Sequence, residues 1–303
     1  MLWTEKYRPK SITELVGQES FKLDAENWIE LNDMPNLLMF GPAGVGKTAA
    51  ALALSKDILG ELFDVNFLEL NASDDRKLET VRTKIKDFVS QGKIGGVPFR
   101  IILLDEVDGM TSDAQNALKR IIERYESNAR FVFTANDRSR IIYPLQSRCA
   151  NYFFESLSNE TMNSLIVRIL EREGHDVPTE LPHLIASYNG DLRRVITELQ
   201  AAIVSGATLK EQVNKGLEEY EAIISKIVDK RHDDALSALY EEIYKGKTVK
   251  DICLGLHDVI SKSKMDTNTK YRLLRVIGEG EWRSTTMTPR ILLSWMIAQT
   301  RMN

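Results

Sequence analysis

The sequence has few cysteines and no long apolar run. Only Cys149 and Cys253 occur among 303 residues, and they lie far apart in the chain. Two isolated cysteines exclude a disulfide framework and a cysteine-based zinc module, and they are typical of a reducing compartment. No apolar run approaches the ~20 residues that cross a bilayer, and the N-terminus lacks a signal-peptide core. We therefore expect no membrane partner and a cytoplasmic protein, or a nuclear one in a eukaryote.

A net basic charge is also missing. The chain carries 40 Lys and Arg against 44 Asp and Glu, a net charge of -4. This balance excludes a generally basic coat for nucleic acid, so any such contact needs a local patch. Histidine is scarce too. The four histidines are scattered through the second half of the chain, and we assign them no metal or acid–base role.

Short apolar runs alternate with helical patterns in the first half of the chain. Runs at 36–40, 67–70, 99–104, 131–135 and 151–154 predict strands. The stretches between them carry apolar residues at helical spacing, as in DAQNALKRIIERY at 113–125. Strands separated by helices predict an α/β domain with a parallel five-stranded sheet and helices on both faces.

After Glu155 the strand signals stop. The stretch 157–174 begins with a cap-like Ser158 and ends at Gly174, which predicts a helix between them. Two more helical patterns follow at 180–190 and 191–206, and the pattern stays helical to the end of the chain. We therefore expect an α/β domain at 1–155, a small three-helix domain at 156–222, and an all-α domain at 223–303.

The stretch GPAGVGKT, at 41–48, matches the phosphate-binding pattern G-x-x-x-x-G-K-[ST] between a predicted strand and a predicted helix. Backbone N–H groups of such a loop face the phosphates, helped by the N-terminus of the helix. We expect Lys47 to bind the terminal phosphates and Thr48 to bind magnesium. The predicted nucleotide-binding residues here are Gly41, Pro42, Ala43, Gly44, Val45, Gly46, Lys47, Thr48 and Ala49.

Polar residues end two further predicted strands. Asp105 and Glu106 follow the apolar run IILL, and burying carboxylates without a cation is costly. Beside a phosphate loop, Asp105 is predicted to hold magnesium and Glu106 to polarise the attacking water; a solvated loop is the alternative. Asn136, after FVFTA, either orients that water or forms an ordinary turn. Spacing alone favours solvent exposure for both arginines of GDLRRV, Arg193 and Arg194.

Taken together, these motifs resemble the AAA+ ATPases, and within them the clamp loaders and the replication factor C small subunits of archaeal or eukaryotic kind. The resemblance covers most of the first 200 residues and becomes one of helical pattern beyond them. The stretches that carry it are WTEKYRPKSITELVGQE (3–19), GPAGVGKT, ELNASDDR (69–76), LLDEVDGMTSDAQNALKRIIERY (103–125), TANDRSRIIYPLQSRC (134–149) and GDLRRV (190–195).

The resemblance implies roles that spacing alone does not assign. The arginine of S-R-C, here Arg148, is expected to reach the γ-phosphate bound by a neighbouring subunit. Asn136 is expected to act as the first sensor of the nucleotide and Arg193 as the second. The residues expected around adenine are Tyr7, Arg8, Pro9, Val16 and Gly17.

The stretch from Asn71 to Arg100 is locally basic, with seven basic residues against four acidic ones. On its predicted helix, Arg82 and Lys86 lie four residues apart and share one side. In clamp loaders this helix and the turn before it track the DNA backbone, so Arg82, Lys86 and Ser73 are expected DNA contacts. Such contacts give affinity and salt dependence without sequence readout. A solvated helix face is the alternative.

The resemblance implies an ATPase that uses ATP and Mg²⁺ to open a PCNA-type sliding clamp and load it onto primer-template DNA. Its expected partners are a replication factor C large subunit and further small subunits, in a pentamer held together by the collar domain at 223–303. Two alternatives stay open: another AAA+ DNA-processing motor, such as a Holliday-junction helicase or a replication-restart ATPase, and a non-catalytic scaffold subunit.

Overall fold

The computed structural model describes residues 1–72, 78–179, 181–188, 190–205 and 209–301. The chain forms two compact units. Unit 1 comprises Met1–Val177 and Tyr188–Gln200, and unit 2 comprises Pro178–Ser187 and Ala201–Asn303. Within the described ranges, no helix is long and apolar enough to span a membrane. The three-domain division with boundaries at 155 and 222 stays a prediction.

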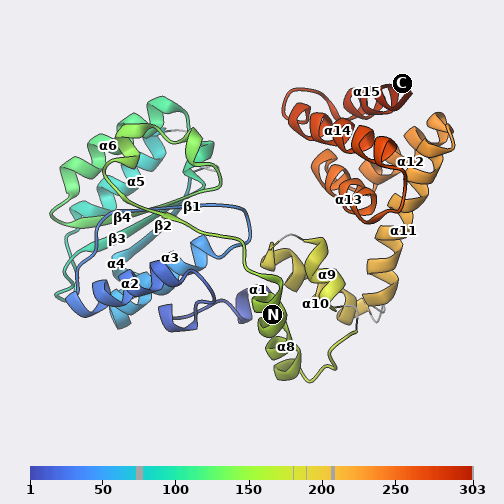
Figure 1. Cartoon of the computed structure of the whole chain (residues 1–303). Helices are drawn as coiled ribbons and strands as arrows, with labels where there is room; N and C mark the ends of the chain where they lie inside the picture. Colours follow the sequence, from blue (N-terminus) through green and yellow to red (C-terminus); the bar gives the residue numbers. More distant parts are fainter. Residues whose placement is uncertain (73–77, 180, 189, 206–208, 302–303) are drawn as a thin grey trace. The chain divides into compact units, whose positions relative to one another are not determined.

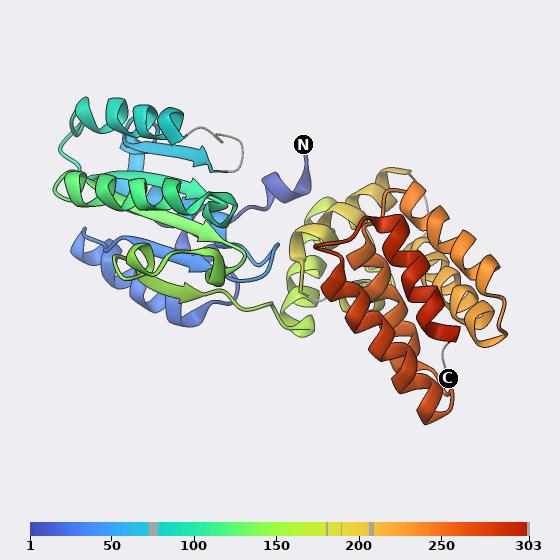
Figure 2. The ribbon, with the colours of Figure 1, turned by 90° about the horizontal axis from the view of Figure 1, so that it is seen from above.

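A parallel five-stranded sheet lies at the centre of unit 1, as predicted (Figure 1). The strand order is β2-β3-β4-β1-β5, and every neighbouring pair is parallel. Figure 2 shows the strands running in one direction. The strands are β1 (Leu37–Phe40), β2 (Phe67–Asn71), β3 (Arg100–Asp105), β4 (Ala129–Ala135) and β5 (Ala150–Phe153).

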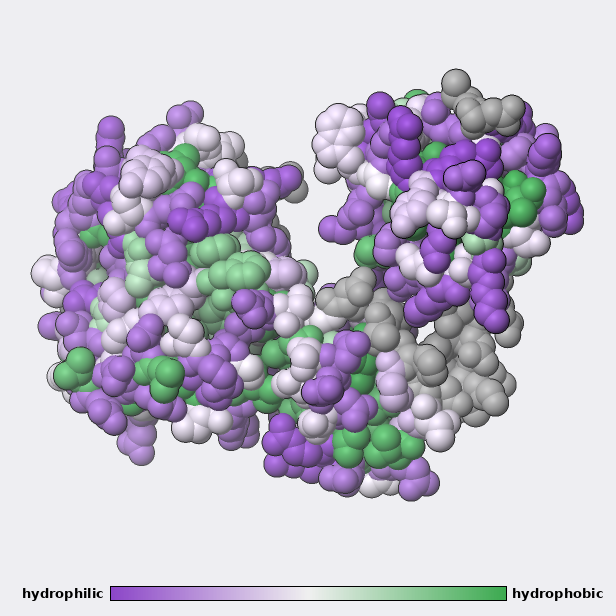
Figure 3. Space-filling model, viewed as in Figure 1, coloured by the Kyte–Doolittle hydropathy of each residue, from purple (hydrophilic) through white to green (hydrophobic). Residues whose placement is uncertain are grey.

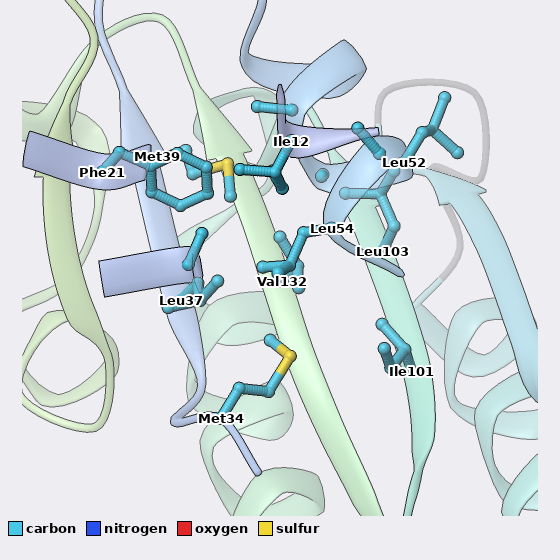
Figure 4. Close-up of a cluster of buried hydrophobic side chains, with 14 of the residues drawn as sticks. Ile12, Phe21, Met34, Leu37, Met39, Leu52, Leu54, Ile101, Leu103 and Val132 are labelled. Carbon is cyan, nitrogen blue, oxygen red and sulfur yellow. The ribbon is translucent and has the colours of Figure 1, made fainter. Parts of the chain in front are cut away.

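Helices cover both faces of this sheet. Helices α2 (Glu19–Leu31) and α3 (Lys47–Leu59) pack on one face, with α5 (Leu78–Ser90) and α6 (Ser112–Tyr125) on the other. Figure 4 shows Leu37 and Met39 of β1 meeting Leu54 of α3 in the first of these two cores. Because burial on both sides favours apolar residues along a strand, the central strands β1, β3 and β4 are mostly apolar, whereas the edge strands β2 and β5 are only partly buried.

Unit 1 continues beyond the sheet with α8 (Asn159–Glu173), whose ends match the predicted caps. The Ser158 side chain accepts a hydrogen bond from the Thr161 N–H, and Gly174 takes a left-handed conformation with φ 73° at the C-terminal end. Shorter helices are α1 (Trp3–Lys6), α4 (Phe63–Asn66) and α7 (Tyr143–Gln146), and α10 spans Leu192–Ser205.

Unit 2 is helical, as expected for the C-terminal part. Its helices bury one apolar core, and hydrophilic residues cover much of the face that Figure 3 shows. The Thr248 side chain and Asp251 form a reciprocal capping box at the start of α13. The helices are α9 (Leu181–Ser187), α11 (Leu209–Val228), α12 (His232–Tyr244), α13 (Val249–Lys262), α14 (Thr267–Arg283) and α15 (Pro289–Arg301).

A buried carboxylate, Glu242 of α12, fixes the loop between α12 and α13. Glu242 is 2% exposed and accepts hydrogen bonds from Lys245, at 2.7 Å, and from Lys247. Burial by itself raises the pKa of Glu242, but the two lysine hydrogen bonds outweigh burial, and the net pKa is lowered. This contribution to stability is therefore present above the ordinary glutamate pKa and is lost as pH falls through the lowered value.

We expect Glu242→Gln to lower the free energy of unfolding by about 1–3 kcal/mol at neutral pH, because it removes a charge from two charge-assisted hydrogen bonds. The difference from wild type should shrink as pH falls from the ordinary glutamate pKa through the lowered pKa of Glu242, where the wild-type side chain also becomes protonated. Urea unfolding across this pH range measures it. Glu241→Gln is the matched control, since the neighbouring Glu241 is exposed. An equal loss at pH 7 and at acid pH would contradict the assignment.

Candidate functional site

The carboxyl ends of three neighbouring strands meet at one edge of the sheet. The strand β1 leads into the loop 41–46, β3 ends at Asp105, and β4 is followed by Asn136. In an open parallel sheet this edge is where ligands bind. The sequence motifs that the chain separates by up to a hundred residues thus come together here.

Two glycines of the loop 41–46 touch other segments so closely that a side chain would not fit. A Cβ on Gly41 would lie 2.2 Å from the carbonyl oxygen of Phe154, and its φ is +147°. A Cβ on Gly44 would lie 1.9 Å from Asp191 Oδ1, and its φ is +76°. The loop therefore requires glycine at both positions on steric and conformational grounds.

The Lys47 ammonium is folded back onto its own loop. It is 8% exposed and donates hydrogen bonds to the carbonyl oxygens of Gly41, at 2.8 Å, and Pro42, at 2.7 Å, and to Asn136 Oδ1, at 3.0 Å. Burial lowers the pKa of Lys47, although neighbouring carboxylates partly offset it. Since its present acceptors are neutral, a phosphate would be a stronger partner for this desolvated cation.

Thr48 and Asp105 bring oxygen atoms together beside this lysine. The Thr48 hydroxyl donates to the two Asp105 carboxylate oxygens at 3.0 and 3.3 Å. Hydroxyl and carboxylate oxygens suit Mg²⁺, which keeps several waters and takes its other ligands from phosphates. No cluster of three His, Cys, Asp or Glu suited to a metal occurs among the described residues. The donor set thus fits a magnesium ion that arrives with a nucleotide.

Sequence reasoning missed two residues that hold this edge in place. Thr134, which is 1% exposed, donates to Asp105 Oδ1 and accepts from the Glu106 N–H at 3.1 Å. The Asp108 carboxylate accepts from the backbone N–H groups of Asn136 and the residue after it, each at 3.2 Å. Asp108 closes the DEVD motif and so carried a signal, whereas Thr134 is one polar residue within an apolar strand.

Most of the predicted nucleotide residues line one cavity of about 200 Å³ in unit 1. Gly17, Gly41 and Pro42 are the predicted residues that do not line it. Helices α8 and α10 add apolar lining residues that the sequence analysis did not foresee, among them Leu165 and Ile196. The predicted residues that line the cavity are Tyr7, Arg8, Pro9, Val16, Ala43, Gly44, Val45, Gly46, Lys47, Thr48, Ala49, Asp105, Glu106, Asn136 and Arg193.

The two arginines of GDLRRV have different surroundings. Arg193 lines the cavity, whereas the Arg194 guanidinium lies 5.0 Å from the centre of the Tyr188 ring. Spacing alone predicted solvent exposure for both, and of the two only Arg193 lines the cavity.

Arg148 does not line this cavity. Its Nε donates to Glu123 Oε1 at 3.0 Å, its Nη2 donates to the same oxygen, and its Nη1 donates to the Pro144 carbonyl oxygen at 2.7 Å. Its side chain is 30% exposed. These contacts use three of the five N–H donors that a guanidinium carries.

The predicted DNA-facing helix is α5, and its two faces differ sharply. Arg82 and Lys86 are exposed, while Val81, Ile85 and Val89 pack on the sheet. Ser73 lies outside the described residues.

Arg100 is one of the seven basic residues between Asn71 and Arg100, but it is 1% exposed and so is not part of a basic surface, contrary to the prediction. It donates to the backbone carbonyl oxygens of Phe88 and Val65, the latter at 2.8 Å, and stacks on the Phe88 ring at 4.0 Å. Arg100 opens a strand whose next four residues are apolar and buried, so its aliphatic stem is buried with them. Carbonyl oxygens near the ends of α4 and α5 accept hydrogen bonds from its guanidinium. Arg100 therefore adds nothing to a surface patch.

Residues 37–157 match the family model described as "ATPase family associated with various cellular activities (AAA)". This span begins at β1 and includes the loop 41–46, Asp105, Glu106, Asn136 and Arg148. It therefore contains the loop 41–46 and the polar residues that follow β3 and β4, but not Arg193.

Solved structures of RuvB from Thermotoga maritima, one titled a Holliday junction branch migration motor, share this fold. Two of them have TM-scores of 0.57 and 0.56 at 17% and 16% identity, and the match covers 77% of this chain and 85% of each RuvB chain. At this level of identity the likeness concerns the fold alone.

Archaeal replication factor C small subunits match nearly the full length. The protein from Methanococcus vannielii is 36% identical, with 98% of this chain and 97% of the relative covered. Those from Natronomonas pharaonis and Archaeoglobus fulgidus are 38% and 37% identical, with 94% of this chain and 90% and 92% of the relatives covered. The chain belongs to the replication factor C small subunits, within the AAA family of ATPases.

Proposed function

We propose that this chain is an ATP-hydrolysing subunit of a clamp loader that opens a PCNA-type sliding clamp and places it on primer-template DNA. One observation carries the proposal. The phosphate and magnesium ends of the cavity are assembled within one chain, whereas Arg148 lies outside that chain's own cavity. Such a division suits an enzyme whose active site is completed by a neighbouring subunit.

Each end of the cavity has a proposed task. Lys47 leaves its loop carbonyls to bind the terminal phosphates, and Thr48 and Asp105 hold the magnesium ion that accompanies ATP. Magnesium supplies positive charge at the phosphates when bound. The Glu106 carboxylate accepts a hydrogen bond from the attacking water and orients it. Asn136 and Arg193 contact the γ-phosphate.

Glu106 has an unusual backbone that favours this task. Its φ is 58°, in the left-handed region that non-glycine residues rarely adopt. The Thr134 hydroxyl accepts its N–H and so fixes this conformation. Residues held in such conformations cluster at active sites, because the surrounding structure must over-determine them.

At the base end, Tyr7, Arg8, Pro9 and Val16 contact adenine in this proposal. The Arg148 guanidinium contacts the γ-phosphate that is bound by the neighbouring subunit, and it stabilises the charge that develops during phosphoryl transfer. Hydrolysis then depends on correct assembly of the subunits.

The proposed partners follow from the replication factor C family. They are a large subunit and further small subunits, arranged as a pentamer through residues 223–303, together with the clamp and DNA. The cytoplasm is the proposed location, or the nucleus if the source is eukaryotic.

ATP turnover tests the proposal under four conditions: the assembled subunits alone, with primed DNA, with primed DNA plus a sliding clamp, and with branched DNA. We expect primed DNA plus the clamp to give the strongest stimulation. Stimulation by branched DNA without any clamp would favour the alternative of a branch-migration motor, whose fold this chain shares. No turnover under any condition would favour a scaffold subunit.

Replacing Arg82 and Lys86 together by alanine should weaken DNA binding without changing ATP binding. Each phosphate contact that is lost should reduce the slope of log affinity against log salt by about one for each altered subunit. The slope, measured by fluorescence anisotropy on primed DNA, is the readout. Arg168→Ala with Lys262→Ala is the control, because both of these basic residues are exposed on other helices. An unchanged slope would assign Arg82 and Lys86 to a solvated helix face.

A further inference from the structure

The first eight residues are attached to helices α8 and α10. The Trp3 N–H donates to Gln200 Oε1 of α10 at 2.9 Å, and Gln200 Nε2 donates back to the Met1 carbonyl oxygen at 3.2 Å. The Trp3 side chain is 6% exposed, and its ring centre lies 6.1 Å from that of His175, just beyond α8. Figure 1 shows α1 beside these helices. We call residues 1–8 the N-terminal strap.

One carboxylate, Glu173, holds the strap at the end of α8. Its Oε1 accepts from both Lys6 Nζ and the Tyr7 hydroxyl, each at 2.5 Å. The hydrogen bonds from Lys6 and Tyr7 lower the pKa of Glu173, so the carboxylate is charged at neutral pH. Charge-assisted hydrogen bonds of this kind are stronger than neutral ones.

The next stretch of the chain is attached elsewhere. The Ile12 N–H donates to Asp57 Oδ2 of α3 at 2.7 Å, and the Ile12 side chain is fully buried in the core beneath α3. Gln18 exchanges hydrogen bonds with the backbone of Glu155, at 2.8 and 3.2 Å, just after β5. The strap and the stretch 12–18 are thus held by different parts of unit 1.

Both attached segments contribute lining residues to the cavity. Tyr7 and Arg8 come from the strap, Leu15 and Val16 from the following stretch, and Ile169 from α8. The cavity therefore has one wall that is attached to α8 and α10 and a second wall that is attached to α3 and to the end of β5. The distance between the walls therefore depends on what holds the strap to α8.

We infer that Glu173 is a positioning residue for nucleotide binding: it holds Tyr7 against the cavity and makes the strap move together with α8 and α10. This inference rests on the proposed binding of a nucleotide in the cavity. Glu173 acts through the strap, because the cavity is lined by Tyr7 and Glu173 is not among the lining residues. Loss of the Glu173 charge weakens the attachment of Lys6 and Tyr7 to α8 and increases the dissociation rate of the nucleotide.

Glu173→Gln tests the inference, since it keeps the shape of the side chain and removes its charge. We expect the Kd for ATP to rise about three- to tenfold, the range for a partly exposed charge-assisted contact. Turnover at saturating ATP should stay unchanged, because the phosphate end is untouched. Glu171→Gln is the control: the same change on the same helix, at an exposed side chain. Tyr7→Phe should weaken binding similarly, and the double variant should lose less than the sum.

Hydrogen exchange gives a readout that a merely structural role would not move. The Lys6 and Tyr7 N–H groups donate to the carbonyl oxygens of Leu2 and Trp3, each at 2.9 Å. ATP should slow their exchange in the wild-type chain and in Glu171→Gln, and much less in Glu173→Gln. Equal Kd and equal protection in both glutamine variants would overturn the inference. Failure of the wild-type chain to bind ATP would instead overturn the proposed function, so the two failures are distinguishable.

Discussion

Arg148→Ala should reduce the ATP turnover of the assembled subunits by about a thousandfold or more while leaving ATP binding intact. An arginine supplied in trans contributes on the order of 10³–10⁵ to the rate, because it neutralises charge that develops on the transferred phosphoryl group. Binding should be spared because Arg148 lies outside the cavity of its own chain. Steady-state turnover and equilibrium binding, measured on the same preparation, test both halves.

Mixing two inactive variants makes this prediction sharper. Arg148→Ala keeps its own phosphate loop, and Lys47→Ala keeps its own Arg148, so a mixed assembly pairs a working loop with a working arginine. With random mixing in equal amounts, about a quarter of the head-to-tail interfaces should recover activity. Arg168→Ala, at an exposed arginine of α8, is the control for loss of a positive charge. A monomer that hydrolyses ATP at full rate without Arg148 would end the proposal.

Lys47→Ala should raise the Kd for ATP by about 10²–10³ and abolish turnover. The ammonium is already desolvated, and its three hydrogen-bond acceptors are neutral oxygens, so a phosphate gains a charged partner at little extra desolvation cost. Removal of a buried charged partner costs several kcal/mol, which corresponds to this range of affinity.

The same variant has a distinctive signature in thermal unfolding. At an ATP concentration about 100 times the wild-type Kd, binding stabilises the wild-type chain by about 2.7 kcal/mol, and a hundredfold weaker variant gains only about 0.4 kcal/mol. In the absence of ATP the variant should be nearly as stable as wild type, since burial disfavours the charged ammonium. Lys56→Ala, at an exposed lysine of the same helix, should keep the full ATP-dependent shift. A normal shift in Lys47→Ala would contradict the assignment.

The strands and the phosphate loop could be predicted from sequence because their signals are local. An apolar run bounded by turn residues marks a strand, and the predicted run at 67–70 differs from β2 by only Asn71. The loop motif specifies its own backbone, including Gly41 and Gly44, whose close contacts exclude other residues. The caps of α8 at Ser158 and Gly174 are likewise local.

The rest of the site depends on contacts between distant segments. Nothing near Thr134 in the sequence indicates that its hydroxyl meets Asp105, which lies on the neighbouring strand. The burial of Arg100 depends on carbonyl oxygens of α4 and α5, and its sequence position suggests only a basic residue. Glu173 reads as an ordinary charge at a helix end until the N-terminal strap is placed against it. Such partners follow from topology, which a single sequence does not give.

The strand β5 is hydrogen-bonded beside β1, and the Phe154 N–H donates to the Phe40 carbonyl oxygen at 2.8 Å. Gly41, the next residue after Phe40, touches the Phe154 carbonyl oxygen so closely that no methyl group would fit. The start of the phosphate loop and the segment that leads from β5 to α8 are therefore in direct backbone contact. A shift of the loop on loss of the γ-phosphate would move the segment before α8 directly, through backbone contacts alone.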